Sequence, residues 1–204
     1  MIEVVYSDKY LAVVIKPVGS ISEEGEGSVP SLIREYLGKS DAYVGTIHRL
    51  DKGVGGLMVY SLDPKITGRL TEAINSDGAG KEYLALLSGV PEKNEDTLTD
   101  LLYHDRAKNK TYVVKRKRGG VKEARLYYRV IDEKEGKALV AVKLYTGRTH
   151  QIRAQFASRG LPLLGDARYG GGKGEISLYS YKLTFVHPVT KKIMEFERNC
   201  PFSI

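Results

Sequence analysis

Short apolar segments of strand length constrain the fold of this 204-residue chain more than any other feature of its sequence. Two strands joined by a polar turn are predicted within residues 2–17, where the continuous apolar run at 11–15 is typical of a buried strand. Further strands are predicted at residues 56–62, 83–87, 126–131, 138–144, 178–185 and 192–197. The strands outnumber the helical segments and do not alternate strictly with them. The pattern therefore indicates an α+β fold with a mixed, mostly antiparallel central sheet flanked by helices.

Three short helices are predicted from capping residues and from the spacing of apolar positions. Ser28 is expected to cap the first helix and Gly38 to end it. Asp63, followed by a proline, is expected to open the second. Thr149 is expected to cap the third, which Gly160 would end. The chain has no internal repeat, low-complexity tract or linker, so we predict a single domain over residues 1–204.

The composition argues against several classes of protein. The single cysteine, Cys200, excludes an internal disulfide and a cysteine-cluster zinc site, and no pair of the four histidines has helical metal-ligand spacing. We therefore expect neither a metal nor a cofactor; the alternative is a zinc site assembled from distant histidines, which no local motif supports. No apolar stretch reaches the length of a membrane span and no secretory signal is evident, which favours a cytoplasmic protein that does not bind a membrane.

The charge balance favours a polyanionic partner. The formal net charge is +7, and each phosphate that a protein neutralises releases condensed counterions. The charge alone leaves the partner open, because many basic proteins bind no nucleic acid. A stretch over residues 106–118 holds seven cations and no acidic residue, with Tyr112 among them. As a hairpin arm it would contact phosphates, and the alternative is a solvated loop that keeps the protein soluble.

A glycine-rich segment over residues 46–56 contains an aspartate between two cations. Arg49 and Lys52 flank Asp51, and nearby positive charge favours the ionised carboxylate. Such a carboxylate can act as a nucleophile toward an electron-poor carbon, and the glycines permit close approach of a ligand. The alternative is a surface loop with an ordinary salt bridge.

Two further segments carry candidate binding residues. In residues 146–153, polar donors crowd the start of an otherwise apolar helix, where Arg153 is placed to pair with a carboxylate or a phosphate. A helix face exposed to water is the alternative. Strand-like alternation over Lys81-Glu82-Tyr83 places Lys81 and Tyr83 on one side. A tyrosine there can stack on a nucleobase, although ordinary packing is the commoner role of a strand tyrosine.

Seven segments follow one another along the chain: Val4-Val5-Tyr6-Ser7-Asp8, Lys16-Pro17-Val18-Gly19, His48-Arg49-Leu50-Asp51 with Gly56-Leu57, Lys81-x-Tyr83-Leu84-Ala85, Thr146-Gly147-Arg148-Thr149-His150-Gln151-Ile152-Arg153, Gly165-Asp166-x-x-Tyr169-Gly170 and Phe185-x-His187-Pro188-x-Thr190. In this order they resemble the RluA-type family of RNA pseudouridine synthases. A single short match would be weak evidence, whereas several in order across the domain are specific. The resemblance implies a cofactor-free isomerase that flips a uridine out of a ribosomal or transfer RNA stem-loop and converts it to pseudouridine. No obligatory protein partner is evident.

The resemblance implies a role for each matched residue. Asp51 would be the catalytic aspartate that attacks the uridine, and Tyr83 would pack against the target base. Arg153 would pair with the catalytic carboxylate, and Arg49 would fill the space left by the extruded nucleotide. The other RNA contacts are expected at His48, Lys81, Arg148, His150, Lys115, Arg116, Lys117 and Arg118.

Four positions depart from the family pattern. Val54 and Gly55 stand where the family usually has threonine and serine, and Asp77 and Ala79 stand where it usually has arginine and valine. The departures concern target choice more than activity, since the three catalytic positions are intact. The chain also starts directly at the catalytic-domain pattern, so we expect recognition to come from this domain and its loops.

Two other functions are open at this point. An RNA-binding or ribosome-assembly module that has lost catalysis would not need an aspartate among phosphate-binding cations. A glycosidase normally needs a second catalytic carboxylate, and the other candidate acid, Asp166, is expected to cap a loop.

Overall fold

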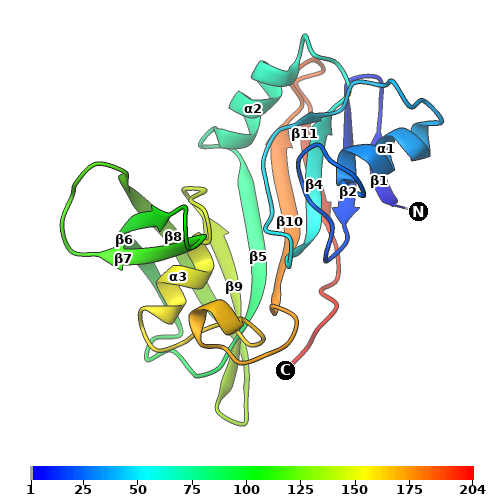
Figure 1. The fold of residues 1–204 in the computed structure, drawn as a ribbon. Coiled ribbons are helices and arrows are strands. Elements are labelled where there is room, and N and C mark those ends of the chain that lie inside the picture. The colour runs from blue at the N-terminus through cyan, green and yellow to red at the C-terminus, as the bar shows by residue number, and fades with distance from the viewer. Residues whose placement is uncertain (1) are drawn as a thin grey trace. The chain divides into compact units, whose positions relative to one another are not determined.

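The computed structural model describes residues 2–204, which form two compact units. The first unit contains the described residues up to Lys81 together with Tyr179–Asn199, and the second contains Glu82–Leu178 with Cys200–Ile204. Within residues 2–204 there are eleven strands, three α-helices and one 3-10 helix (Figure 1). In the same part of the chain, none of the helices has the length and apolar character needed to cross a bilayer.

The first unit is built on strands in the order β1-β2-β4-β10. Strand β10 runs parallel to β4, and the other pairs in this unit are antiparallel. Gly56 at the start of β4 is therefore flanked by Lys16 of β2 and Ser180 of β10. The strands are β1 (Glu3–Ser7), β2 (Leu11–Lys16), β4 (Gly55–Ser61) and β10 (Leu178–Val186), with β3 (Gly45–Thr46) on β4 and β11 (Ile193–Glu197) on β10.

Two helices complete the first unit, α1 (Val29–Leu37) and α2 (Thr67–Asn75). Helix α1 begins and ends as predicted, because Ser28 accepts a hydrogen bond from the backbone N–H of Ser31 and Gly38 takes a left-handed backbone at φ 64°. Burial of each large apolar side chain contributes about 1.5–3 kcal/mol, so the shared core fixes β2, β4 and β10 and the loops attached to them. That core contains Leu11, Val13, Leu57, Val59, Ile66, Leu70, Ile74, Leu183 and Phe185.

The second unit is an antiparallel sheet in the order β5-β9-β8-β6-β7. Helix α3 (Gln151–Ala157) packs against β6 and β7, and Ala154 joins Leu102 and Ala124 in a small core there (Figure 1). A 3-10 helix, η1 (Ala167–Tyr169), follows α3. The strands are β5 (Gly80–Leu87), β6 (Glu95–Asp105), β7 (Lys110–Val114), β8 (Val121–Lys134) and β9 (Lys137–Leu144).

The predicted α+β class with a mixed, mostly antiparallel sheet is confirmed. Two predicted helix starts are wrong. Asp63 accepts a hydrogen bond from the backbone N–H of Lys65, a local turn that delays α2 until Thr67. Helix α3 begins only after His150, which takes a left-handed backbone at φ 53°, so Thr149 is not its cap. The single domain over residues 1–204 stays a prediction.

Candidate active site

The loop that carries Asp51 lies between β3 and β4, and its backbone is held at several points. The Ser22 hydroxyl donates to the carbonyl of Leu50 at 2.7 Å and accepts from the N–H of the same residue at 3.1 Å. The carbonyl of Asp51 accepts from the N–H of Val54 at 2.9 Å, which closes a tight turn. Leu50 and Val54 are both buried. Asp51 therefore stands on a fixed turn between two buried anchors.

Lys16, at the end of β2, supports this turn from within the protein. Its ammonium donates to the carbonyls of Pro17 at 3.0 Å, Lys52 at 3.2 Å and Val54 at 2.8 Å. Burial lowers the pKa of Lys16 to about 8, and the negative charge of Asp51 opposes that shift. At neutral pH the buried ammonium thus fixes the backbone of the turn that carries Asp51.

His48 and Lys81 are both positioned by contacts within the first unit. Nε2 of His48 accepts a hydrogen bond from the backbone N–H of Val59 at 3.2 Å. Burial, with a smaller contribution from the charge of Lys81, lowers the pKa of His48 to about 3, so the ring is neutral at physiological pH. Burial also lowers the pKa of Lys81, whose ammonium donates to Asn75 at 3.0 Å. The RNA contacts of His48 and Lys81 stay predictions.

Arg49 lies at the surface next to the fixed turn. Its guanidinium pairs with Glu23 at 3.0 Å, and the two side chains are 60% and 61% exposed. Exposed pairs of this kind contribute about 0–1 kcal/mol. Arg49 can therefore exchange Glu23 for another partner at little cost.

The start of β4 accepts no side chain at Gly56. This residue has φ +117°, and a Cβ atom on it would lie 2.3 Å from the carbonyl oxygen of Ser180. Such a distance is far below any real contact, so the pairing of β4 with β10 requires glycine here. The backbone that follows the Asp51 turn is fixed by this close approach.

The four departures from the family pattern fall into two places. Val54 is buried, and its carbonyl is one of the acceptors of Lys16, while Gly55 opens β4. Asp77 is exposed and Ala79 half-buried in the turn that joins α2 to β5. Their effect on target choice stays a prediction.

In the second unit, Arg153 of α3 binds Asp166 through two parallel hydrogen bonds. Nε donates to Oδ2 at 2.7 Å and Nη2 donates to Oδ1 at 2.9 Å. Both side chains are buried. The prediction that Asp166 caps a loop is wrong, because η1 begins without a side-chain cap and the carboxylate of Asp166 binds Arg153 instead.

Arg148 and His150 lie just before α3. The exposed Arg148 donates from Nε to the carbonyl of Glu123 at 2.9 Å. His150 is buried, and its Nδ1 lies 3.0 Å from the Tyr169 hydroxyl. The structure thus brings Arg148, His150 and Arg153 together at one helix start, as their spacing predicts. Their contacts with RNA stay predictions.

Tyr83 lies in β5 opposite Val142 of β9 and is buried. Its position is compatible with the ordinary packing role that a strand tyrosine usually has. The base contact implied by the family resemblance stays a prediction.

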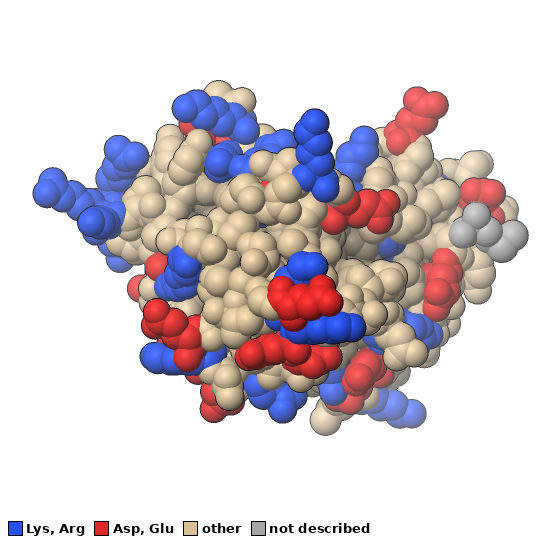
Figure 2. Space-filling model, turned by 90° about the horizontal axis from the view of Figure 1, so that it is seen from below, with Lys and Arg blue, Asp and Glu red and all other residues tan. Residues whose placement is uncertain are grey.

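The basic stretch 106–118 is divided between the two ends of β7. Arg106 and Lys108 belong to the turn between β6 and β7, whereas the exposed cations Lys115, Arg116, Lys117 and Arg118 belong to the loop between β7 and β8. The guanidinium of Arg118 lies over the ring of Tyr103 at 5.1 Å. Figure 2 shows lysine and arginine side chains projecting at the upper left of the molecule, with acidic side chains lying below them.

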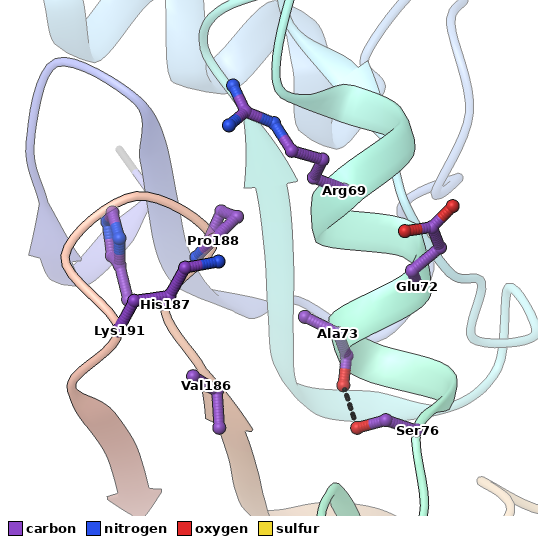
Figure 3. Close-up of a pocket in the computed structure, with 8 residues that line it drawn as sticks. All are labelled: Arg69, Glu72, Ala73, Ser76, Val186, His187, Pro188 and Lys191. Carbon is purple, nitrogen blue, oxygen red and sulfur yellow. Dashed lines mark hydrogen bonds between the residues drawn. The ribbon is translucent and has the colours of Figure 1, made fainter.

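A pocket of about 320 Å³ in the first unit is lined by other residues (Figure 3). One wall comes from α2 and the residue after it, and the other from the end of β10 and the turn between β10 and β11. No residue that the sequence singled out as catalytic or RNA-binding lines this pocket. The lining residues are Arg69, Glu72, Ala73, Ser76, Val186, His187, Pro188 and Lys191.

Three residues have structural roles in these sites that the sequence did not predict: Lys16 and Tyr169 were assigned no role, and Asp166 was expected to cap a loop. Each belongs to a quoted motif, so the motif match was the available signal. A buried lysine bound to three carbonyls and a buried ion pair both depend on contacts between distant parts of the chain. Local pattern does not reveal such contacts.

Comparison with protein families gives one match that spans most of the chain. The model described as RNA pseudouridylate synthase matches residues 10–158. These residues include Asp51, Tyr83 and Arg153 but not Asp166 or Tyr169.

Individual relatives and solved structures agree with this match. A ribosomal large subunit pseudouridine synthase D from Zymomonas mobilis is 30% identical, over 98% of this chain and 69% of the relative. An uncharacterized RNA pseudouridine synthase from Aquifex aeolicus is 32% identical, over 96% of this chain and 68% of the relative. The structure of human RNA pseudouridylate synthase domain containing 4 superposes with a TM-score of 0.81 at 21% identity, over 98% of this chain and 88% of the human one, which shows a shared fold.

Proposed function

The chain belongs to the RNA pseudouridylate synthase family, and from this premise we propose that it isomerises uridine in ribosomal or transfer RNA with Asp51 as the catalytic residue. The observation that carries the proposal is the family match over residues 10–158, because it includes Asp51, Tyr83 and Arg153 in their motifs. As a member of this family, the chain is an isomerase.

The proposed reaction rearranges one nucleotide without any net change in composition. The carboxylate of Asp51 attacks C1′ of the ribose, and the bond between N1 of the base and C1′ breaks. The detached uracil turns while it is still bound, and C5 then bonds to C1′ as the bond between C1′ and the Asp51 carboxylate breaks. C5 loses its proton and N1 gains one, so the product is an isomer of the substrate. The step needs no oxidant, reductant or metal.

The target base must first leave the RNA helix, because Asp51 cannot reach it inside a stem. We propose that Tyr83 packs against the flipped base and that Arg49 occupies the vacated stack. The exposed position of Arg49 and its weak pair with Glu23 support this role. Rotation of a detached base needs an enclosed site with little water, and such a site also strengthens ionic contacts.

The surroundings of Asp51 place a positive charge beside its turn. The ammonium of Lys16 binds two carbonyls of that turn, and the charge of Asp51 opposes the lowering of the Lys16 pKa by burial. We propose that Arg153 pairs with the Asp51 carboxylate. A guanidinium has five N–H groups, so Arg153 can bind Asp166 and a second anion together.

The names of the relatives favour ribosomal RNA as the substrate. Two of them, from Zymomonas mobilis and Nitrosomonas europaea, are named as synthases of the large ribosomal subunit. We propose that Lys115, Arg116, Lys117 and Arg118 contact RNA phosphates, supported by their exposure and by the absence of acidic residues among them. We propose that the chain acts in the cytoplasm, because such a substrate would be found there.

The proposal is tested in cells that lack the gene. Pseudouridines are mapped by carbodiimide-dependent primer extension, and the gene is then restored as wild type, Asp51→Asn or Asp41→Asn. Asp41 is an exposed loop residue, so it provides a matched control. We expect one or more pseudouridines to disappear on deletion and to return with wild type and Asp41→Asn only.

Two outcomes would contradict the proposal. If every pseudouridine persists without the gene, the chain is not the enzyme for any mapped site in that cell. If Asp51→Asn restores a lost pseudouridine, the chemistry does not depend on this carboxylate. A ribosome defect that Asp51→Asn corrects without restoring pseudouridine would favour an assembly module without catalysis.

A further inference from the structure

Tyr169 contacts both Arg153 of α3 and His150, the residue just before that helix. Its ring lies 5.0 Å from the guanidinium carbon of Arg153. Its hydroxyl accepts a hydrogen bond from the backbone N–H of Thr111 at 2.7 Å and lies 3.0 Å from Nδ1 of His150. One side chain therefore joins the first turn of α3 to the start of β7.

We propose that Tyr169 is a positioning residue that holds the Arg153 guanidinium through its ring and the start of α3 through its hydroxyl. The inference rests on the proposed catalytic role of Arg153. It adds a residue beyond the matched segment 10–158 and assigns separate tasks to the two ends of one side chain.

The ring of Tyr169 and the carboxylate of Asp166 contact different sides of the Arg153 guanidinium. Asp166 binds the edge of the guanidinium through Nε and Nη2, and Tyr169 covers its face. Asp166 immediately precedes η1 and Tyr169 ends it. A cation over an aromatic face gains about 0.5–2 kcal/mol depending on solvent exclusion. Together the two contacts fix both the plane and the direction of the guanidinium.

The hydroxyl acts at a backbone position that needs support. His150 takes φ 53°, and α3 begins there without a side-chain cap. A left-handed backbone costs a residue with a Cβ atom about 1–2 kcal/mol. Burial raises the pKa of Tyr169, so the phenol keeps its proton and can donate it to His150 while accepting from Thr111. The His150 ring is thereby held where the strained turn begins, three residues before Arg153.

The β7 end of this link is itself fixed. Thr111 is buried, and its hydroxyl donates to the carbonyl of Thr149 at 2.8 Å. The same hydroxyl lies 3.0 Å from Nδ1 of His104. The anchor of the Tyr169 hydroxyl is therefore a strand of the sheet, so the hydroxyl ties the helix start to a stable part of the unit.

Two substitutions separate the ring from the hydroxyl. Tyr169→Phe keeps the ring over Arg153 and removes the two hydroxyl contacts. Tyr169→Leu removes the aromatic ring as well as the hydroxyl. The matched control is Tyr128→Phe, since Tyr128 is a buried tyrosine of the same unit that packs on Phe156 of α3 and donates to the carbonyl of Lys93.

Each variant is tested with the target RNA in single turnovers at saturating enzyme, where the rate constant does not depend on the fraction of active protein. RNA affinity is measured separately.

A misplacement of about 1 Å in a catalytic group can cost about 100-fold in rate. On that scale we expect the rate constant of Tyr169→Leu to fall at least about 30-fold and that of Tyr169→Phe about 5-fold. RNA affinity should stay within about 2-fold for both variants, because Tyr169 acts by positioning Arg153, directly through its ring and indirectly through the start of α3. Tyr128→Phe should match wild type in both measurements.

The inference is overturned if Tyr169→Phe has the wild-type rate constant, or if both variants lose RNA affinity with unchanged rate constants. Should Tyr169→Leu not fold, Tyr169→Phe decides alone. Arg153→Ala and Asp51→Asn, tested alongside, separate this result from the proposed function. If those two variants keep the wild-type rate, the proposed function fails, whereas their loss of rate with unaffected Tyr169 variants contradicts only the role of Tyr169.

Discussion

Arg153 and Asp166 form a buried ion pair in which two N–H groups of the guanidinium bind the two oxygens of the carboxylate, at 2.7 and 2.9 Å. Their side chains are only 6% and 1% exposed. Two parallel hydrogen bonds fix the direction of an arginine as well as its place. Asp166 therefore determines the orientation in which the Arg153 guanidinium can bind any further partner.

Removal of one member of this pair should destabilise the protein strongly. Asp166→Asn leaves the charge of Arg153 buried without its counterion, a change that typically costs about 3–5 kcal/mol. The matched control is Asp100→Asn, because Asp100 also binds an arginine, Arg159, but with the guanidinium side chain 34% exposed. We expect urea unfolding to show a clearly larger loss for Asp166→Asn. Equal losses for the two variants would contradict this account of the pair.

Two glycine substitutions should have opposite effects on the free energy of unfolding, because only one of the two glycines lies where β4 closely approaches β10. Gly56→Ala places a methyl group 2.3 Å from the carbonyl oxygen of Ser180 at φ +117°. We expect it to cost at least about 2 kcal/mol of unfolding free energy. Gly68→Ala in α2 meets no atom within 4 Å and should stabilise the protein by about 0.5–1 kcal/mol. Thermal and urea unfolding measure both, and a neutral Gly56→Ala would show that the strand pairing tolerates a side chain.

The neutral His48 should make the protein sensitive to acid. Its pKa is lowered from 6.5 to about 3 in the folded state, so below about pH 6.5 the unfolded chain binds a proton that the folded protein does not. Unfolding free energy should therefore fall as the pH falls, by about 2 kcal/mol between about pH 7 and about pH 5 from this residue. In His48→Gln this part of the pH dependence should disappear. Parallel slopes for wild type and His48→Gln in urea unfolding over that range would contradict it.

Metal removal should leave the activity unchanged. The proposed reaction uses a carboxylate, an arginine and a tyrosine, and it needs no Lewis acid to break or form a bond. The test is dialysis against a chelator, with the activity then measured in a potassium buffer that keeps the RNA stem folded. A large loss of activity, restored by one particular divalent ion, would show that the expectation of a cofactor-free enzyme is wrong.

Local chemistry was enough to predict the parts of the fold that depend on neighbouring residues. Ser28 and Gly38 bound α1 as predicted, because each acts on backbone within its own turn. Thr149 looked equally suitable as a cap, yet its carbonyl is bound by Thr111 and α3 begins after a left-handed His150. That outcome depends on contacts between segments far apart in the chain.

In the candidate site, too, the features that depend on neighbouring residues could be predicted, and those that depend on distant contacts could not. The motifs drew attention to Asp51, Arg153 and Asp166, since their spacing along the chain is visible in the sequence. The pairing of Arg153 with Asp166 was not predicted, because it depends on how the segment after α3 folds back onto that helix. The support that Lys16 gives to the Asp51 turn is likewise a contact across 36 or more residues.

The central claim, that Asp51 carries out the isomerisation, is tested most directly by the fate of the hydrogen at C5 of the target uridine. Formation of the bond from C5 to C1′ must release that hydrogen, so RNA tritiated at C5 reports the chemical step by itself. Wild type should release tritium, whereas Asp51→Asn should release none while it binds the RNA with an affinity within about 3-fold of wild type. Release of tritium by Asp51→Asn at a rate near that of wild type would contradict the claim.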